Sequence, residues 1–359
     1  MGKLLIKTVI RSVVVALALS AGVVITANAE TTRLSGTDRY LTSDAIVKAG
    51  WPTGAETAVL ASGLDANKVD ALTVAPLAKT KNAPVVLVNP KDSVATIVSK
   101  FKALNIKTVY IANGVGVIST QVEAGLKAAS ITTVNRLGGA NRYQTALNIA
   151  KELGASNSIV VACGDDAHLV DSLSIAPIAA AKGMPIFLCG SSLDAVTTTY
   201  INSLGVKTTY VLGGTSVVSD KAVSSLKGVT RLFGDGRYET NAKVVDTFKT
   251  DTALNFNNIY IASGEDANLI DALAGAPLAA LTGAPIIFVH DTINPAVNTL
   301  LKSIVNTTTK ITELGGIGAV TTAANRAINT IQTGIMFDYS SYNGVCLTIN
   351  TVSFKSKRN

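Results

Sequence analysis

The sequence predicts an α/β protein made of three tandem copies of one small, Rossmann-like parallel-sheet domain. An octet of the pattern Arg-Leu-x-Gly-x-x-Arg-Tyr begins at Arg33, Arg136 and Arg231. These starts lie 103 and 95 residues apart, which is the length of a whole small domain rather than of a solenoid unit. Within each copy, short apolar runs alternate with helical patterns, as in parallel strands joined by helices.

Further motifs follow every octet in the same order. An apolar run ends in a small residue and a glycine, and a turn rich in acidic residues then leads to an Ala-Pro pair. A second proline opens another apolar run, and a third run ends in a glycine turn. This shared order predicts the same succession of strands and helices in every copy.

The elements of the first copy follow from its apolar spacing. Apolar and small residues at helical intervals predict a first helix over Tyr40–Ala49. A short, partly β-branched run before Gly63 predicts a strand over Thr57–Ala61. The same reasoning predicts, in order, a helix over Val69–Lys79, a strand over Val85–Val88, a helix over Val94–Leu104, a strand over Thr108–Ala112, a helix over Ser119–Ala129 and a strand over Thr132–Val134.

Each copy is thus expected to be a doubly wound sheet of about four strands, with its binding edge at the loops that follow the strands. Almost no linker separates the copies, and all are apolar, so we expect them to pack about a pseudo-threefold axis as a pseudo-trimer. We expect Ile335, Met336 and Phe337 to supply the closing strand of the third copy. The predicted segments are a signal peptide at 1–29, repeats at 30–135, 136–230 and 231–337, and a short basic tail at 338–359.

The first 29 residues have the pattern of a secretory signal peptide. Lys3, Lys7 and Arg11 precede an apolar stretch from Val13 to Ile25, and an Ala-Asn-Ala cleavage site follows. The alternative is an uncleaved membrane anchor, but the apolar stretch is short for a membrane span. We therefore expect a secreted chain with no transmembrane segment after cleavage.

The formal net charge of +7 overstates how basic the folded part is. Residues 30–332 contain 25 basic and 23 acidic residues, a net charge of +2, because the signal peptide and the tail hold the rest of the excess. Such a surface does not suit nucleic acid, so an anionic partner has to be met by local clusters.

The cysteines show no repeat symmetry. Cys163, Cys189 and Cys346 make an odd number, which argues against a disulfide framework. We expect small, buried, unpaired thiols, although Cys163 and Cys189 end neighbouring strands and a bond between them is conceivable.

The second arginine and the tyrosine of each octet are the first candidate site residues. A guanidinium offers a planar cation to phosphate or carboxylate groups, and a tyrosine ring can stack on a sugar. The alternative is structural, with the arginine bonded to carboxylates or strand-end carbonyls. The candidates are Arg39, Tyr40, Arg142, Tyr143, Arg237 and Tyr238.

Repeated aspartates are the second candidate group. Asp70, Asp171 and Asp271 fall in the first turn of a predicted helix, where the helix dipole favours a carboxylate. Capping and turn formation explain them without a ligand. The alternative is that these aspartates, and those five residues earlier, pair with the arginines or accept hydrogen bonds from sugar hydroxyls.

Other chemistries find little support in the sequence. Gly114-Val115-Gly116 and Gly316-Ile317-Gly318 follow the third strand and lack a third glycine, so a tight turn explains them better than a dinucleotide. His168 and His290 occupy unrelated positions in their repeats, and no Ser/His/Asp set or zinc motif can be assembled.

Together the octet, the Ala-Ser-Gly…Asp-Ala-Leu turn, the Pro-Ile-Leu-Leu-like strand and the Leu-Gly-Gly turn resemble the cell-wall-binding repeat 2 family of Gram-positive surface proteins. The resemblance covers about Arg33 to Gln332. It departs from the family pattern at Asn113, where a glycine is usual.

The resemblance implies a Toprim-like α/β fold in each repeat and an intramolecular pseudo-trimer. It also implies non-covalent attachment to an anionic cell-wall polysaccharide, with another region usually supplying a specific activity. Only 27 residues follow the third repeat here, which we expect to be too few for an effector domain. Toprim enzymes hold magnesium with an Asp-x-Asp that these strands lack, so we expect neither a metal nor another cofactor.

The sequence therefore predicts a secreted, non-enzymatic cell-wall anchor that binds an anionic polysaccharide through three repeats. Three weak sites on one chain would gain avidity for a polymer. Two alternatives stay open: a structural surface-layer protein whose main partner is another protein, and an enzyme with a site in one repeat.

Overall fold

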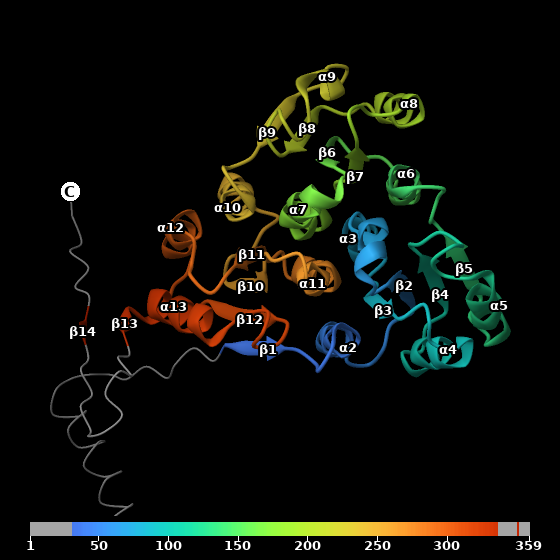
Figure 1. Ribbon diagram of the computed structural model, residues 1–359, viewed down its shortest axis with the longest axis horizontal. Coiled ribbons are helices and arrows are strands. Elements are labelled where there is room, and N and C mark those ends of the chain that lie inside the picture. Colours follow the sequence, from blue (N-terminus) through green and yellow to red (C-terminus); the bar gives the residue numbers. More distant parts are fainter. Residues whose placement is uncertain (1–30, 337–349, 352–359) are drawn as a thin grey trace, which may run out of the picture. The chain divides into compact units, whose positions relative to one another are not determined.

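The computed structural model of the protein describes residues 31–336 and 350–351. In this part of the chain three four-stranded sheets form, and all neighbouring strands within them run parallel (Figure 1). The first sheet has the order β3 (Val85–Val88), β2 (Thr57–Ser62), β4 (Thr108–Ile111), β5 (Thr133–Arg136). The second has the order β7 (Ile186–Cys189), β6 (Ser158–Cys163), β8 (Thr208–Leu212), β9 (Val229–Leu232). The third has the order β11 (Ile286–Val289), β10 (Asn258–Ser263), β12 (Lys310–Leu314), β1 (Thr32–Leu34). The predicted α/β class with three tandem parallel-sheet repeats is confirmed.

The fourth strand of each sheet carries the arginine that opens an octet. β5 ends at Arg136 and β9 includes Arg231, so each strand leads directly from one repeat into the next. The third sheet is closed instead by β1, which pairs with β12 and places Arg33 opposite Glu313. The first described strand therefore completes the last sheet.

The prediction that residues 335–337 close the third sheet is wrong. β13 (Ile335–Met336) pairs antiparallel with β14 (Asn350–Thr351) in a separate two-stranded ribbon, and Phe337 lies outside the described residues. The physical reason is that β1 already occupies the edge of β12 where a closing strand would bind. The segment predicted as a signal peptide, Cys346 and residues 353–359 also lie outside the described part.

Helices cover the sheets, mostly where the apolar pattern predicts them. The main difference is the predicted helix over 69–79, which is a 3₁₀ helix, η1 (Asp65–Ala71), followed by a short α3 (Ala75–Thr80). The second and third repeats have continuous helices here, α7 (Leu169–Lys182) and α11 (Leu269–Leu281). The β-branched pair Thr73-Val74 separates η1 from α3, and such residues disfavour helix. The other helices are α2 (Arg39–Gly50), α4 (Val94–Ala103), α5 (Thr120–Ala128), α6 (Arg142–Leu153), η2 (Asp166–His168), α8 (Ala195–Ser203), α9 (Asp220–Val223), α10 (Arg237–Thr247), α12 (Pro295–Ile304) and α13 (Thr322–Thr333).

The three repeats pack against one another through α3, α7 and α11. Each of these helices contacts the other two, and in Figure 1 they lie between the three sheets. Small residues such as Ala78, Ala179 and Ala279 are fully buried there, which lets the helices approach closely. One apolar core joins residues of all three repeats. A linear string would leave the first and third repeats apart, so the predicted pseudo-trimer is confirmed.

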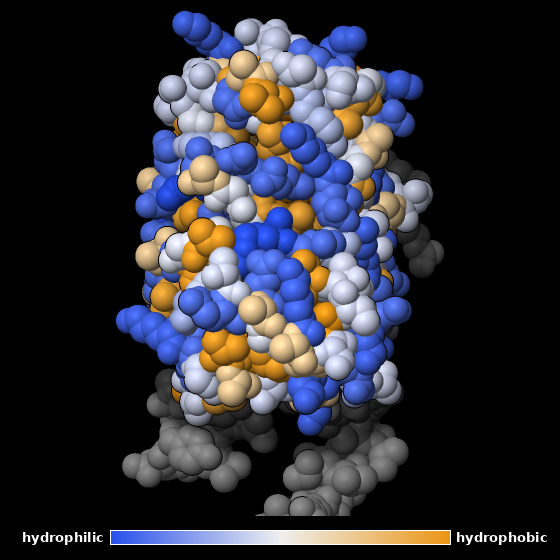
Figure 2. Space-filling view, turned by 90° about the vertical axis from the view of Figure 1, so that its right-hand side faces the viewer, coloured by the Kyte–Doolittle hydropathy of each residue, from blue (hydrophilic) through white to orange (hydrophobic). Residues whose placement is uncertain are grey.

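One face of the protein is mostly polar. On this face, which Figure 2 shows, hydrophilic residues predominate and apolar residues form small, separate groups. Such a face suits polar ligands better than a large apolar partner surface. Among the described helices, none is both long and apolar enough to cross a membrane.

Candidate functional site

The first arginine of each octet ties its strand to the glycine turn beside it. The Arg33 guanidinium donates to the carbonyl oxygens of Gly315 at 2.8 Å and Val320 at 2.9 Å, and it forms an ion pair with Glu313. Arg136 and Arg231 donate in the same way, each at 2.8 Å, to the carbonyls of Asn113 and Gly213. These contacts attach the edge strand to the neighbouring turn, which explains why an arginine occupies the first position of the octet.

The second arginine of each octet forms hydrogen bonds at the end of the central strand in its own repeat. It is the first residue of its helix, and its Nη1 donates both to the carbonyl of the glycine after the strand and to an aspartate two residues further on. The distances to the aspartate Oδ1 are 2.8 Å for Arg39–Asp65, 2.7 Å for Arg142–Asp166 and 2.9 Å for Arg237–Asp266. The pairing between arginine and aspartate, which the sequence left open as an alternative, is therefore present in all three repeats for Asp65, Asp166 and Asp266. Together with the bonds to the strand-end carbonyls, these are the contacts that the structural alternative for the arginines described.

These three arginines keep donor capacity. Between 26% and 28% of each side chain stays exposed. Arg39 uses a second nitrogen, Nη2, on Asp65 at 3.1 Å, and this hydrogen bond holds the pKa of the Asp65 carboxyl below its usual value. Within the described residues, Arg142 and Arg237 form hydrogen bonds through Nη1 alone. Their other N–H groups can meet an anion.

The repeated tyrosines pack on the same strand-end glycines. A Cβ added to Gly63, Gly164 or Gly264 would lie 2.4, 2.7 or 2.6 Å from Cε1 of the tyrosine in that repeat. The ring therefore needs glycine beneath it. The rings of Tyr40, Tyr143 and Tyr238 are partly exposed, so each leaves some surface available to a ligand.

Replacing Gly264 by alanine is expected to destabilise the protein by about 1–3 kcal/mol, because the new methyl group collides with the Tyr238 ring. Urea unfolding monitored by circular dichroism measures this change. Gly318→Ala is the matched control, since an added Cβ there meets nothing within 4 Å. Equal stability of the two variants would contradict the packing of tyrosine on glycine.

Each repeated aspartate lies on an element that packs against the arginine-bearing helix of another repeat. η1 contacts α6, α7 contacts α10, and α11 contacts α2. The positive charges of Arg142, Arg237 and Arg39 accordingly act on the carboxyl groups of Asp70, Asp171 and Asp271. We call these three Asp-and-Arg junctions the inter-repeat sites; the sequence pattern places both residue types at sheet edges but does not show that they come from different repeats.

At two inter-repeat sites, burial has a larger effect on the pKa of the aspartate than the nearby arginine has. Asp171 and Asp271 are only 6% and 7% exposed. Burial raises the pKa of each carboxyl to about 6, although the nearby arginine acts in the opposite direction. Burial also raises the pKa of Asp70, against a hydrogen bond from Asn113.

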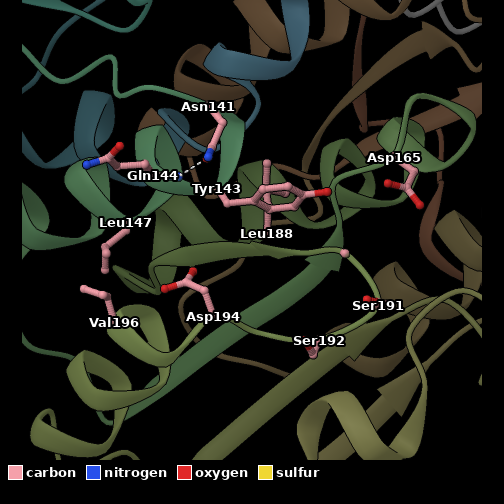
Figure 3. A pocket seen from close by; sticks show the side chains of 11 residues that line it. Asn141, Tyr143, Gln144, Leu147, Asp165, Leu188, Ser191, Ser192, Asp194 and Val196 are labelled. Atoms are coloured by element: carbon pink, nitrogen blue, oxygen red, sulfur yellow. Dashed lines mark hydrogen bonds between the residues drawn. The ribbon is translucent and has the colours of Figure 1, made fainter.

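A pocket of about 580 Å³ opens on the second repeat (Figure 3). The Tyr143 ring lies on its wall, between Asp165 on one side and Asp194 on the other. Asp194 also caps α8, accepting a hydrogen bond from the backbone N–H of Thr197 at 2.9 Å. The serine-rich loop of this pocket belongs to no motif that the copies share, so the sequence did not indicate the pocket. The lining residues are Asn141, Tyr143, Gln144, Leu147, Asp165, Leu188, Gly190, Ser191, Ser192, Asp194 and Val196.

The two described cysteines are free and buried. Cys163 and Cys189 are register partners on β6 and β7, as their positions at strand ends predicted. Burial raises the pKa of the Cys189 thiol to about 12, which disfavours the thiolate form.

Comparison with known proteins agrees with this architecture. The family model of cell wall binding domain 2 matches residues 33–123, 136–223 and 231–325. The chain is 33% identical over 249 residues to the N-acetylmuramoyl-L-alanine amidase LytC of Bacillus subtilis (strain 168), covering 69% of this chain and 48% of that protein. It is 32% identical over 278 residues to the amidase enhancer of the same organism, covering 76% of this chain and 37% of that protein.

Solved structures show the same fold. Cwp6 from Clostridium difficile superposes with a TM-score of 0.75 at 30% identity, over 85% of this chain and 47% of that one. Cwp8 from the same organism gives a TM-score of 0.76 at 27% identity, over 90% of this chain and 55% of that one. The chain thus spans about half or less of the curated relatives it matches. Three family matches that coincide with the three structural repeats show that the chain belongs to the cell wall binding domain 2 family.

Proposed function

We propose that the chain is a secreted, non-enzymatic anchor that holds a protein to the cell wall by binding an anionic wall polysaccharide non-covalently. The observation that carries this proposal is the repetition of the inter-repeat site. At each junction the charge of a partly exposed arginine acts on an aspartate of another repeat, and the tyrosine that follows this arginine in the sequence is also partly exposed. A polymer with a charge on every unit can meet several such junctions at once.

Each group has a distinct task in this proposal. The free N–H groups of the second octet arginine meet a phosphate or carboxylate, because a guanidinium binds such anions with directed hydrogen bonds. The tyrosine ring supports a sugar face, and the aspartate accepts a hydrogen bond from a sugar hydroxyl. The proposed binding residues are Arg39, Tyr40, Asp70, Arg142, Tyr143, Asp171, Arg237, Tyr238 and Asp271.

The pocket beside Tyr143 supports a carbohydrate ligand. An aromatic ring surrounded by serine, asparagine and carboxylate groups matches the mixed apolar and hydroxyl surface of a sugar. The family membership supports the wall as the location. The amidase and the amidase enhancer named above match this chain over only part of their length, so we assign the repeats to attachment rather than to catalysis.

Wall binding should weaken as salt rises, because the proposal depends on charge. Raising ionic strength from about 0.01 M to about 1 M shortens the screening length from about 30 Å to about 3 Å. Co-sedimentation with purified Gram-positive walls measures the bound fraction at each salt concentration. Binding that does not respond to salt would favour the alternative of a surface-layer protein held by another protein, and release of wall fragments by the chain would favour an enzyme.

A further inference from the structure

Asn113 makes the first repeat different from the other two. Its side chain is fully buried at the end of β4. The amide nitrogen donates to Oδ2 of Asp70 at 3.1 Å and to the carbonyl of Asn67 at 3.3 Å, while the amide oxygen accepts from the backbone N–H of Ser62 at 2.8 Å. The Asp70 carboxylate therefore receives a hydrogen-bond donor from within its own repeat.

The second and third repeats have glycine at this position and offer no such donor. Gly213 and Gly315 have φ of +93° and +99°, a conformation that a side chain disfavours. A Cβ added to Gly315 would collide with Oδ2 of Asp271, and one added to Gly213 would lie 3.3 Å from Oδ2 of Asp171. The two carboxylates thus lie directly over the glycine turns.

Asp171 and Asp271 form no side-chain hydrogen bond or ion pair with any residue in 31–336, although both residues are more than nine-tenths buried. Among the described residues, the fully enclosed side-chain atoms without a partner are Thr73 Oγ1 and Gln332 Oε1, so the two carboxylates keep a small opening to solvent. A carboxylate that has no protein donor and little solvent is costly. The raised pKa values of about 6 reflect the same cost. Such groups are retained most simply where a ligand supplies the missing donor.

We infer that Asp171 and Asp271 are open acceptor sites for a neutral hydrogen-bond donor of the wall polymer, a sugar hydroxyl or amide N–H, whereas Asn113 fills the equivalent place in the first repeat. This narrows the acceptor role proposed above to Asp171 and Asp271: the Asp70 carboxylate already receives the Asn113 donor, so the chain has two open carboxylate sites for three repeats. This inference rests on the proposed function and adds the number and the chemistry of its acceptor sites.

The surroundings favour a neutral donor over a cation. The charged or titratable groups that act on Asp171 are His168 and Arg237, and Arg39 acts on Asp271. Those arginines would repel a cation approaching the carboxylate. Asn113 also shows which chemistry the place accepts, since it presents a neutral amide N–H to Asp70.

The test compares Asp171→Asn, Asp271→Asn and Asp70→Asn in the full chain, using co-sedimentation with purified Bacillus subtilis walls. Asp171→Asn and Asp271→Asn are each expected to weaken binding about tenfold, because a hydrogen bond to a charged acceptor is lost. Asp70→Asn is expected to have an effect at least about fivefold smaller, because its carboxylate already has a donor. Asp246→Asn, on the exposed side of α10, is the matched control for loss of one negative charge.

A melting experiment separates lost binding from lost folding. The folded pKa of Asp171 and Asp271 lies above the usual value of 3.8, so their burial destabilises the fold as pH rises through about 6. At pH 7 the double variant Asp171→Asn/Asp271→Asn should therefore melt at a higher temperature than the parent, and below about pH 4 this gain should disappear. Weaker binding by a more stable protein indicates a ligand site rather than a structural role.

Asn113→Gly provides the opposite test. Removal of the side chain frees the Asp70 carboxylate and should tighten binding to the walls severalfold, and adding Asp70→Asn should abolish the gain. If the parent binds walls but all three aspartate variants lose binding equally, or none does, the inference is overturned while the proposed function stands. A parent that does not bind walls overturns the proposed function itself.

Discussion

Replacing Arg33 by methionine is expected to cost about 3–5 kcal/mol of folding free energy, which exceeds the expected cost of Gly264→Ala. The Glu313 side chain is 2% exposed, and it would lose its cationic partner while staying buried in β12. The substitution also removes the two hydrogen bonds that attach β1 to the neighbouring turn. Since β1 closes the third sheet, the loss affects the contact between the first and last repeats.

Chemical denaturation measures this loss, and two variants serve as controls. Arg136→Met removes the corresponding arginine of the first sheet, but its acidic partner, Glu123 on α5, is 22% exposed and can be solvated, so the cost should be smaller. Arg33→Met/Glu313→Leu removes both charges and should recover most of the stability. If Arg33→Met were as stable as the parent, the closure by β1 would not contribute to folding.

Replacing the second octet arginine of all three repeats by glutamine is expected to reduce wall binding by more than about 100-fold, because the losses multiply when several sites hold one polymer. A single replacement should weaken binding only modestly. The paired aspartates are 54% to 80% exposed, so each ion pair contributes at most about 1 kcal/mol to stability. The triple variant should therefore fold. Its substitutions are Arg39→Gln, Arg142→Gln and Arg237→Gln.

Circular dichroism and a melting curve must accompany the binding measurement, since each arginine also bonds a strand-end carbonyl. The matched lysine triple variant keeps the charge but loses the fork of donors, and it should bind with intermediate strength. A folded glutamine triple variant that sediments like the parent would remove these arginines from the binding site.

Local pattern was enough to predict the repeated elements of the fold. The strand over 85–88 and the helix beginning at residue 94 follow from apolar spacing, and both occur where that spacing places them. The break between η1 and α3 was not predicted, because the apolar spacing of the first copy is compatible with one continuous helix. Two β-branched residues, Thr73 and Val74, lie at the break, whereas the aligned positions of the continuous helices hold one such residue, Ile175, or none.

Relations between distant segments were beyond the sequence pattern. The pairing of β1 with β12 joins strands about 280 residues apart, and no spacing rule indicates it. The approach of Asp171 to Arg237 is likewise set by the packing of α7 on α10. Asn113 was visible as a departure from the repeat pattern, but its meaning became clear only when its hydrogen bond to Asp70 was seen.

The central claim is that this chain binds the anionic polymer of the wall. Co-sedimentation of the full chain with purified walls, before and after chemical extraction of that polymer, tests it most directly. The account predicts strong binding to intact walls and nearly complete loss on extracted walls at the same wall mass, and the extracted polymer should compete with intact walls for the chain. Equal binding to intact and extracted walls would contradict the account.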